Sequence, residues 1–217
     1  MREITRAIIS NLSRRYPALK SCESSVEAAA EVLLRCFADG GKLLVCGNGG
    51  SASDSEHIVG ELMKTFMLDR PLDASMCEKL RTAYPEHADK MIANLQRAVP
   101  AISLVSETAL MTAYTNDNSA EMAFAQQVLS YGRPGDMLLA ITTSGNSVNV
   151  LNAARIARVT GVEVLGLTGE SGGKIKSLSD VCICVPSSIT YQIQEYHLPI
   201  YHCLCACVEN ELFGTDA

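Results

Sequence analysis

The chain has 217 residues, with 18 Lys or Arg against 24 Asp or Glu, so its formal charge is −6 at pH 7. Apolar residues make up 47% and charged residues 19%, which excludes a disordered chain and fits a single α/β domain over residues 1–217. The acidic balance argues against nucleic acid as a partner, because nucleic-acid binding needs basic surface, but backbone N–H groups can still hold a small phosphorylated ligand.

Two helices are predicted before the first strand. An amphipathic helix at the N-terminus is indicated by an apolar residue at every fourth position, namely Ile4, Ile8, Leu12 and Tyr16. A second helix is predicted over residues 24–39, where Ser-Ser-Val-Glu fits a capping box and two glycines follow the last turn.

Alternating strands and helices occupy most of the remaining chain. Short apolar runs predict buried strands over residues 42–46, 100–106, 137–141, 162–167 and 181–185. Helical patterns follow some of these strands, over residues 53–67, 107–114 and 148–159. Such alternation indicates a parallel sheet covered on both faces. We therefore predict a doubly wound α/β fold with extra N-terminal helices.

The segment 72–99 interrupts this alternation. It carries charged residues around the apolar Met91, Ile92 and Leu95, and Pro85 divides it. Linkers lack such periodicity, so we predict a helical insertion within the domain.

The nine cysteines occur in an odd number and at irregular spacing, mostly among apolar residues. The run Cys203-Leu-Cys205-Ala-Cys207 lacks the paired spacing of zinc sites, so core packing is favoured over metal binding. The N-terminus has no apolar segment before a cleavage site, and no run of 18 apolar residues occurs. We expect a cytoplasmic protein with free thiols and no membrane association.

Two loops of small residues follow the predicted strands 42–46 and 137–141. Gly47–Ser51 (GNGGS) matches neither the dinucleotide fingerprint nor the P-loop, so no nucleotide is indicated. Thr142–Ser147 (TTSGNS) offers four hydroxyls before a helix N-terminus, which suits an anion. Taken alone, the first loop has the less favoured alternative of a tight connection without a ligand, and in the second loop Ser147 could serve only as a helix cap. Together, at the C-terminal ends of parallel strands, they predict a ligand-binding crevice.

Two pairs of polar side chains supply further candidates. His57 and Glu61 are four residues apart and share a helix face, where they form either a surface pair or a metal or proton-transfer site. Gln194 and His202 lie about 12 Å apart along a regular helix axis. Pro199 between them removes one backbone N–H, so either a kink or a site shared by two subunits would bring them together.

In this order and spacing, the motifs resemble the phosphosugar-binding domain of the sugar isomerase (SIS) family, and within it the bacterial phosphoheptose isomerases. The resemblance extends to about Phe213. The motifs are CGNGGS from Cys46, HxxxE from His57, Asn116-Asp117, TSGNS from Thr143, LTG from Leu167 and QExHxxxxH from Gln194.

The resemblance implies an aldose–ketose isomerase that converts sedoheptulose 7-phosphate into glycero-manno-heptose 7-phosphate. It implies Glu61 as the general base and His202 as the second proton-transfer group, and gives His197 no role beyond packing or surface. Implied substrate contacts are Asn48, Gly49, Gly50, Ser51, Glu61, Asn116, Asp117, Thr142, Thr143, Ser144, Ser147 and Gln194. Zinc, bound in some members, would be held by His57, Glu61, Gln194 and His202.

The same resemblance implies a homotetramer and no nucleotide or redox cofactor. Subunit contact is also indicated by the apolar stripe of the first helix and by a C-terminal helix that is apolar on more than one face.

Two non-catalytic alternatives share the fold: a regulator that binds a replication initiator, and a sugar-phosphate sensor. Glu61 favours the enzyme, because the regulator branch lacks this glutamate. Phosphoheptose isomerases typically carry arginine where Thr65 stands, and Lys64 is a poor geometric replacement. Isomerase chemistry is therefore better supported than heptose specificity.

Overall fold

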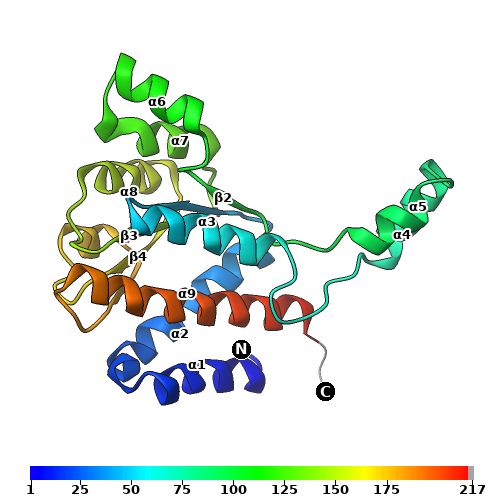
Figure 1. Cartoon of the computed structure of the whole chain (residues 1–217), viewed down its shortest axis with the longest axis horizontal. Coiled ribbons are helices and arrows are strands. Elements are labelled where there is room, and N and C mark those ends of the chain that lie inside the picture. Colours follow the sequence, from blue (N-terminus) through cyan, green and yellow to red (C-terminus); the bar gives the residue numbers. More distant parts are fainter. Residues whose placement is uncertain (215–217) are drawn as a thin grey trace.

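A five-stranded parallel sheet forms the centre of the protein in the computed structural model, which describes residues 1–214 (Figure 1). The strands are β1 (Leu43–Cys46), β2 (Ala101–Ser103), β3 (Met137–Thr142), β4 (Glu163–Thr168) and β5 (Val181–Cys184). Their spatial order is β2-β1-β3-β4-β5, so the winding direction reverses between β1 and β3. This confirms the doubly wound fold. In sheets of this kind, ligands bind at the C-terminal ends of the strands on either side of such a reversal, here β1 and β3.

Helices cover both faces of the sheet. One face carries α2 (Glu23–Ala38), α3 (Gly50–Met63) and α9 (Thr190–Phe213), with α1 (Glu3–Arg15) packed outside α9; the other carries α7 (Ala123–Tyr131) and α8 (Val148–Thr160) (Figure 1). Leu139 and Ile141 of β3 point into the first core, and Leu138 and Ala140 into the second. Because both faces are covered, all of β3 is buried and its sequence is continuously apolar.

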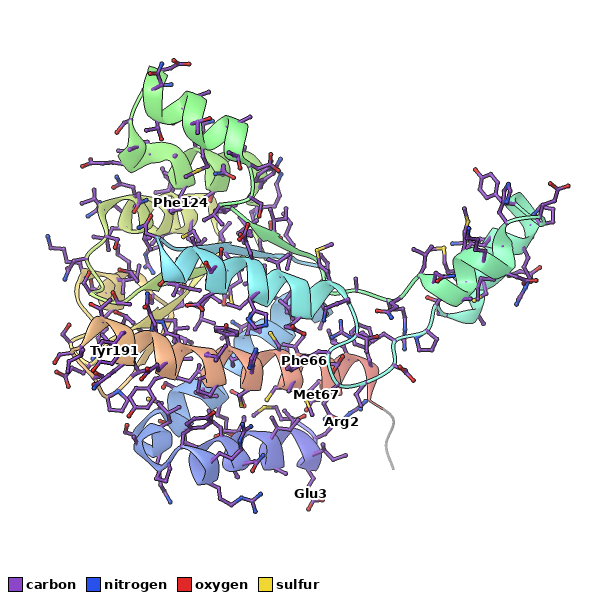
Figure 2. The ribbon with its side chains drawn as sticks, in the orientation of Figure 1. Arg2, Glu3, Phe66, Met67, Phe124 and Tyr191 are labelled. Carbon is purple, nitrogen blue, oxygen red and sulfur yellow. The ribbon has the colours of Figure 1, made fainter. Side chains whose placement is uncertain are left out.

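Large side chains lie either in one of these two cores or on the surface. Phe124 is buried in the core beneath α7 and α8, whereas Tyr191, at the start of α9, is 60% exposed (Figure 2). The remaining short elements are η1 (Pro17–Cys22), α6 (Thr108–Asp117), η2 (Ala120–Met122) and η3 (Lys174–Leu178). Within residues 1–214, no helix combines the length and apolarity that a bilayer crossing requires.

The C-terminal helix α9 continues through Pro199 without ending. It packs against α1, α2 and α3 of its own chain, which explains why it is apolar on more than one face. That apolar character therefore no longer argues for a partner subunit. The cysteines are free thiols, and Cys203, Cys205 and Cys207 are buried, in agreement with the packing interpretation.

The start of α2 differs from the sequence prediction. The helix begins at Glu23, and its N-cap residue Cys22 makes no side-chain cap bond. Ser25 Oγ donates instead to the Cys22 carbonyl at 2.8 Å. The predicted capping box is therefore wrong, because η1 leads directly into α2 and leaves no extended N-cap residue.

The helix α3 begins and ends earlier than the predicted range of 53–67. It ends at Met63 because the following backbone N–H groups bind a buried carboxylate on α9 instead of helix carbonyls. Glu209 accepts hydrogen bonds from the backbone of Phe66, Met67 and Leu68 at 2.7–3.1 Å. Glu209 also pairs with the buried Arg70 guanidinium at 2.7 Å.

Two helices project from the sheet as an arm between α3 and β2 (Figure 1). They are α4 (Ala74–Ala83) and α5 (Ala88–Asn94). Asp73 caps α4 by accepting a hydrogen bond from Met76 N at 2.8 Å. In these two helices only Ala88 is buried. The two ends of the arm meet in an antiparallel bridge between Pro71 and Gln96.

Candidate active site

The first loop of the crevice turns directly from β1 into α3. Gly49 has φ +57°, a backbone conformation that disfavours any residue with a Cβ. A Cβ on Gly47 would meet the Ser51 carbonyl oxygen at 2.6 Å. Asn48, Gly49 and Gly50 are exposed, whereas Ser51 is buried. The loop thus leads directly into a helix N-terminus, a place where proteins often bind anions.

The second loop, between β3 and α8, lines the other side of the crevice. Thr142 and Ser147 join their hydroxyl groups at 3.0 Å. Ser147 is the N-cap residue of α8 but makes no side-chain cap bond. Ser144 is exposed and Thr143 half-buried. This loop therefore presents hydroxyl donors beside the N-terminus of a 13-residue helix.

Asn149, which the sequence did not single out, joins the two loops. Its side-chain amide exchanges hydrogen bonds with that of Asn48, at 2.8 and 2.9 Å. The available signal was its place in the first turn of α8, just after the hydroxyl-rich loop. The reciprocal pair ties the loop after β1 to the first turn of α8.

Three predicted residues meet where α3 lies against α9. His57 Nε2 lies 3.2 Å from Glu61 Oε1 and 3.5 Å from His202 Nε2. The imidazole rings of His57 and His202 are edge-to-face, with centroids 4.9 Å apart. The predicted base and the predicted second proton-transfer group are therefore neighbours within one chain.

Electrostatics differ across this cluster. Lys64 Nζ lies 3.1 Å from Glu61 Oε2, on a side chain that is 60% exposed. Burial and the neighbouring His57 lower the pKa of His202 below its ordinary value, and Glu61 only partly opposes this. At neutral pH His202 is therefore an uncharged imidazole, which can accept or deliver a proton.

Gln194 lies at the other end of the α3–α9 contact. A Cβ on Gly50 would meet Gln194 Nε2 at 2.5 Å, so the amide packs tightly on the start of α3. Because α9 runs on through Pro199, Gln194 stays about two helical turns from His202. One chain brings Gln194 to the first loop, and not to the cluster of His57, Glu61 and His202.

Asn116 and Asp117 lie apart from the rest of the predicted site within one chain. They end α6, which packs on η2 and α7, and Figure 1 shows α6 far from α9. Both side chains are exposed, and Asn116 Nδ2 donates to Asp117 Oδ1 at 2.9 Å.

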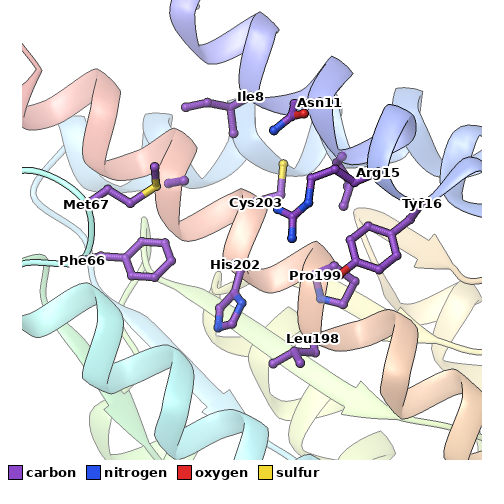
Figure 3. A pocket seen from close by; sticks show the side chains of 12 residues that line it. Ile8, Asn11, Arg15, Tyr16, Phe66, Met67, Leu198, Pro199, His202 and Cys203 are labelled. Carbon is purple, nitrogen blue, oxygen red and sulfur yellow. The ribbon is translucent and has the colours of Figure 1, made fainter.

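A cavity of about 230 Å³ opens beside His202, between α1, α9 and the segment after α3. Figure 3 shows Arg15 extending over α9 toward His202, with Phe66 opposite. The rings of Phe66 and His202 have centroids 5.6 Å apart. His202 thus separates this cavity from His57.

The residues predicted to hold zinc do not form a ready-made site in one chain. Among residues 1–214, no three His, Cys, Asp or Glu side chains are arranged to hold a metal ion. The chemical types are suitable, since zinc takes imidazole and carboxylate ligands. The fourth predicted ligand, Gln194, is absent from the cluster.

Known proteins resemble the chain over most of its length. Residues 9–96 and 106–201 each match the SIS domain. A phosphoheptose isomerase from Shewanella loihica is 37% identical over 209 residues, 95% of this chain and 93% of the relative. The structure of a phosphoheptose isomerase from Neisseria gonorrhoeae superposes with a TM-score of 0.73 at 33% identity, covering 94% of this chain and 96% of that one. For another from Francisella tularensis the TM-score is 0.74 at 31% identity, with 93% of each chain covered.

Proposed function

Because the chain belongs to the phosphoheptose isomerase family of SIS domain proteins, we propose that it isomerises sedoheptulose 7-phosphate to glycero-manno-heptose 7-phosphate. One structural observation carries this proposal. Glu61 and His57 on α3 lie beside His202 on α9, and α3 begins at the first small-residue loop. An aldose–ketose isomerase needs a base and a proton carrier side by side, and this cluster supplies both.

Glu61 is the proposed base. Its carboxylate takes the proton from carbon 1 of the ketose, and the C–H electron pair forms the double bond of an enediol while the carbonyl oxygen of carbon 2 gains a proton. Return of a proton to carbon 2, with loss of the hydroxyl proton on carbon 1, gives the aldose. His202 carries the protons that move on and off the two oxygens, a role that suits a neutral imidazole.

The crevice between β1 and β3 holds the rest of the substrate in this proposal. Thr143, Ser144 and Ser147 would donate hydroxyl hydrogen bonds to the phosphate at the N-terminus of α8. The first loop and Gln194 would contact the sugar. Anchoring the phosphate makes the proton transfer effectively intramolecular, which lowers its barrier.

Zinc binding by this protein is a further part of the proposal. Three of the predicted ligands lie side by side, with Glu61 Oε1 and His202 Nε2 at 3.2 and 3.5 Å from His57 Nε2, although they are not arranged around a metal position among residues 1–214. His57, Glu61 and His202 would supply imidazole and carboxylate ligands, and bound zinc would supply Lewis-acid polarisation of the sugar oxygens. Three protein ligands suffice for a catalytic zinc site, where water or substrate takes the fourth position.

We propose a homotetramer with sites at subunit boundaries. Ile4 of the predicted stripe is 49% exposed, and Met67 (65%) and Leu198 (42%) flank the cavity beside His202. Asn116 and Asp117 also need a second chain if they are to reach a substrate held by the first. Both observations favour an assembly that completes each site across an interface.

The nine free cysteines support the proposed cytoplasmic location, where thiols stay reduced. The rival regulator or sensor lacks turnover. Incubation with sedoheptulose 7-phosphate and a panel of other ketose phosphates therefore decides the matter. We expect the heptose aldose to form from sedoheptulose 7-phosphate. If no ketose phosphate gave an aldose product, the non-catalytic role would be favoured.

A further inference from the structure

A buried carboxylate on α9 binds the backbone that leaves α3. Glu209 is 1% exposed, and each of its two oxygens accepts two hydrogen bonds. Oε1 accepts from the Phe66 backbone N–H at 2.9 Å and from Arg70 Nε at 2.7 Å. Oε2 accepts from the backbone N–H groups of Met67 and Leu68 at 2.7 and 3.1 Å. Because a buried charge is costly unless it is paired and hydrogen-bonded, these contacts fix residues 66–68 against α9.

The guanidinium of Arg70, which pairs with Glu209, holds the last turn of α3. Its Nη1 donates to the Leu62 carbonyl at 2.7 Å, and its Nη2 donates to the Glu61 carbonyl at 3.2 Å. Both carbonyls lie at the C-terminal end of α3, where helix carbonyls lack intrahelical N–H partners and favour a cation. The backbone of Glu61, the proposed base, is thus tied to α9 through the buried pair of Arg70 and Glu209.

The segment held by Glu209 also carries the ring that packs on His202. The rings of Phe66 and His202 have centroids 5.6 Å apart and are tilted by 36°. Glu209 follows His202 by seven residues on α9, which is about two helical turns, so both side chains leave the same face of the helix. The buried pair therefore acts on both proposed proton-transfer groups, on Glu61 through the end of α3 and on His202 through Phe66.

We propose that Glu209 is a positioning residue, which acts with Arg70 to hold the base and the second proton-transfer group in register. Glu209 itself touches no substrate. Proton transfer requires groups within hydrogen-bond reach of the reacting atoms, and a misplacement of about 1 Å can cost about 100-fold in rate. The inference rests on the isomerase function proposed above and names the contact that keeps Glu61 and His202 together.

The test compares two glutamates on α9. Glu209→Gln replaces one oxygen by an amide group that cannot accept a hydrogen bond, so N–H groups of residues 66–68 lose a partner. Glu211→Gln is the matched control, because Glu211 accepts hydrogen bonds from Arg2 N and Thr5 Oγ1 at 2.5 and 2.6 Å and so ties α9 to α1 instead. We expect kcat to fall about 10–100-fold in Glu209→Gln, with KM nearly unchanged because the crevice loops are untouched. The control should keep wild-type kinetics.

Thermal unfolding gives the folded fraction of each variant, so kcat can be expressed per folded molecule. A pair that only stabilises the fold would lower the melting temperature and leave this kcat unchanged, which would overturn the inference. Phe66→Leu is a second variant, which keeps the buried pair and removes the ring from His202. Its control is Phe37→Leu, half-buried in the same core. Unchanged kcat in Phe66→Leu would overturn the inference even if Glu209→Gln did not fold.

The ring signals of His202 in proton–carbon NMR, assigned by their loss in His202→Ala, report on its surroundings without any turnover. They should shift in Glu209→Gln and keep their positions in Glu211→Gln. Unshifted His202 signals in a folded Glu209→Gln would overturn the inference. Wild-type protein that isomerises no ketose phosphate would instead refute the proposed function, while these signals would still judge the contact from Glu209 to His202.

Discussion

Lys64 and His57 approach Glu61 from opposite ends of its carboxylate, with 3.1 Å between Lys64 Nζ and Glu61 Oε2 and 3.2 Å between His57 Nε2 and Glu61 Oε1. The cation beside Glu61 is therefore Lys64, the residue before Thr65, where the family resemblance led us to expect an arginine. The carboxylate is thus fixed at both oxygens.

Glu61→Gln tests the role of this carboxylate as the base. The amide keeps the shape of the side chain and cannot take a proton, so kcat should fall about 10²–10⁴-fold while KM changes little. Steady-state kinetics on the best ketose phosphate measure the effect. Glu56→Gln, on an exposed position of the same helix, is the matched control and should retain activity. Near-wild-type turnover by Glu61→Gln would assign the residue a purely structural role.

Metal analysis tests zinc binding. Purified wild-type protein should contain zinc, and His57→Ala should contain much less, because imidazole is a favoured zinc ligand. His202→Ala should behave similarly. His87→Ala, at the tip of the arm before α5, should match the wild type. Equal zinc in wild type and His57→Ala would remove His57 from any metal site.

Mixing inactive variants tests whether sites are shared between subunits. Glu61 and His202 belong to one cluster within a chain, so mixed oligomers of Glu61→Gln and His202→Ala should stay inactive. Asn116 and Asp117 lie apart from that cluster. Mixing Glu61→Gln with an Asn116→Ala/Asp117→Ala variant should restore about a quarter of wild-type activity when each site combines two chains.

The mixture needs subunits that exchange, which native mass spectrometry of differently labelled chains verifies. No recovery in verified mixed oligomers would mean that one chain builds each site. A fully active monomer at assay concentration would contradict the tetramer itself.

His197 predicts a loss of stability in acid. Burial lowers the pKa of His197 from 6.5 to about 4, and a backbone hydrogen bond with Thr168 only partly opposes this shift. Below pH 6.5 His197 takes up a proton in the unfolded chain but stays neutral in the folded chain. The free energy of unfolding therefore falls as the pH drops toward 4. The loss approaches about 3 kcal/mol, from about 1.4 kcal/mol per pKa unit.

Urea unfolding between pH 7 and 4.5 measures this slope. His197→Leu should flatten it, because the variant has no imidazole to titrate. His87→Leu, whose imidazole lies on the projecting arm, should keep the wild-type slope. The same slope in His197→Leu as in the wild type would assign the acid sensitivity to other groups.

Local pattern predicted the sheet and missed contacts between distant segments. β3 was recognisable because burial on both faces leaves an uninterrupted apolar run. The early end of α3 was not, because Glu209 reaches its backbone from the other end of the chain. The Ser24 capping box failed for a local reason, since the 3₁₀ turn before it leaves no extended residue to act as the cap.

The candidate site was also predicted only in part from the sequence. Spacing on one helix placed His57 and Glu61 together, and resemblance added His202. Tyr201 carries no motif of its own, and only the contact between α3 and α9 reveals its place beside His57. Asn149 was missed for the same reason, because its partner Asn48 belongs to another loop.

The arm of α4 and α5 leaves the body and returns to it at one place, since Pro71 and Gln96 pair side by side. Its removal would therefore leave two chain ends already adjacent, and a short turn could rejoin them without shifting β1 or β2. The arm is thus a module that evolution or an engineer can lengthen, exchange or delete while the crevice keeps its shape.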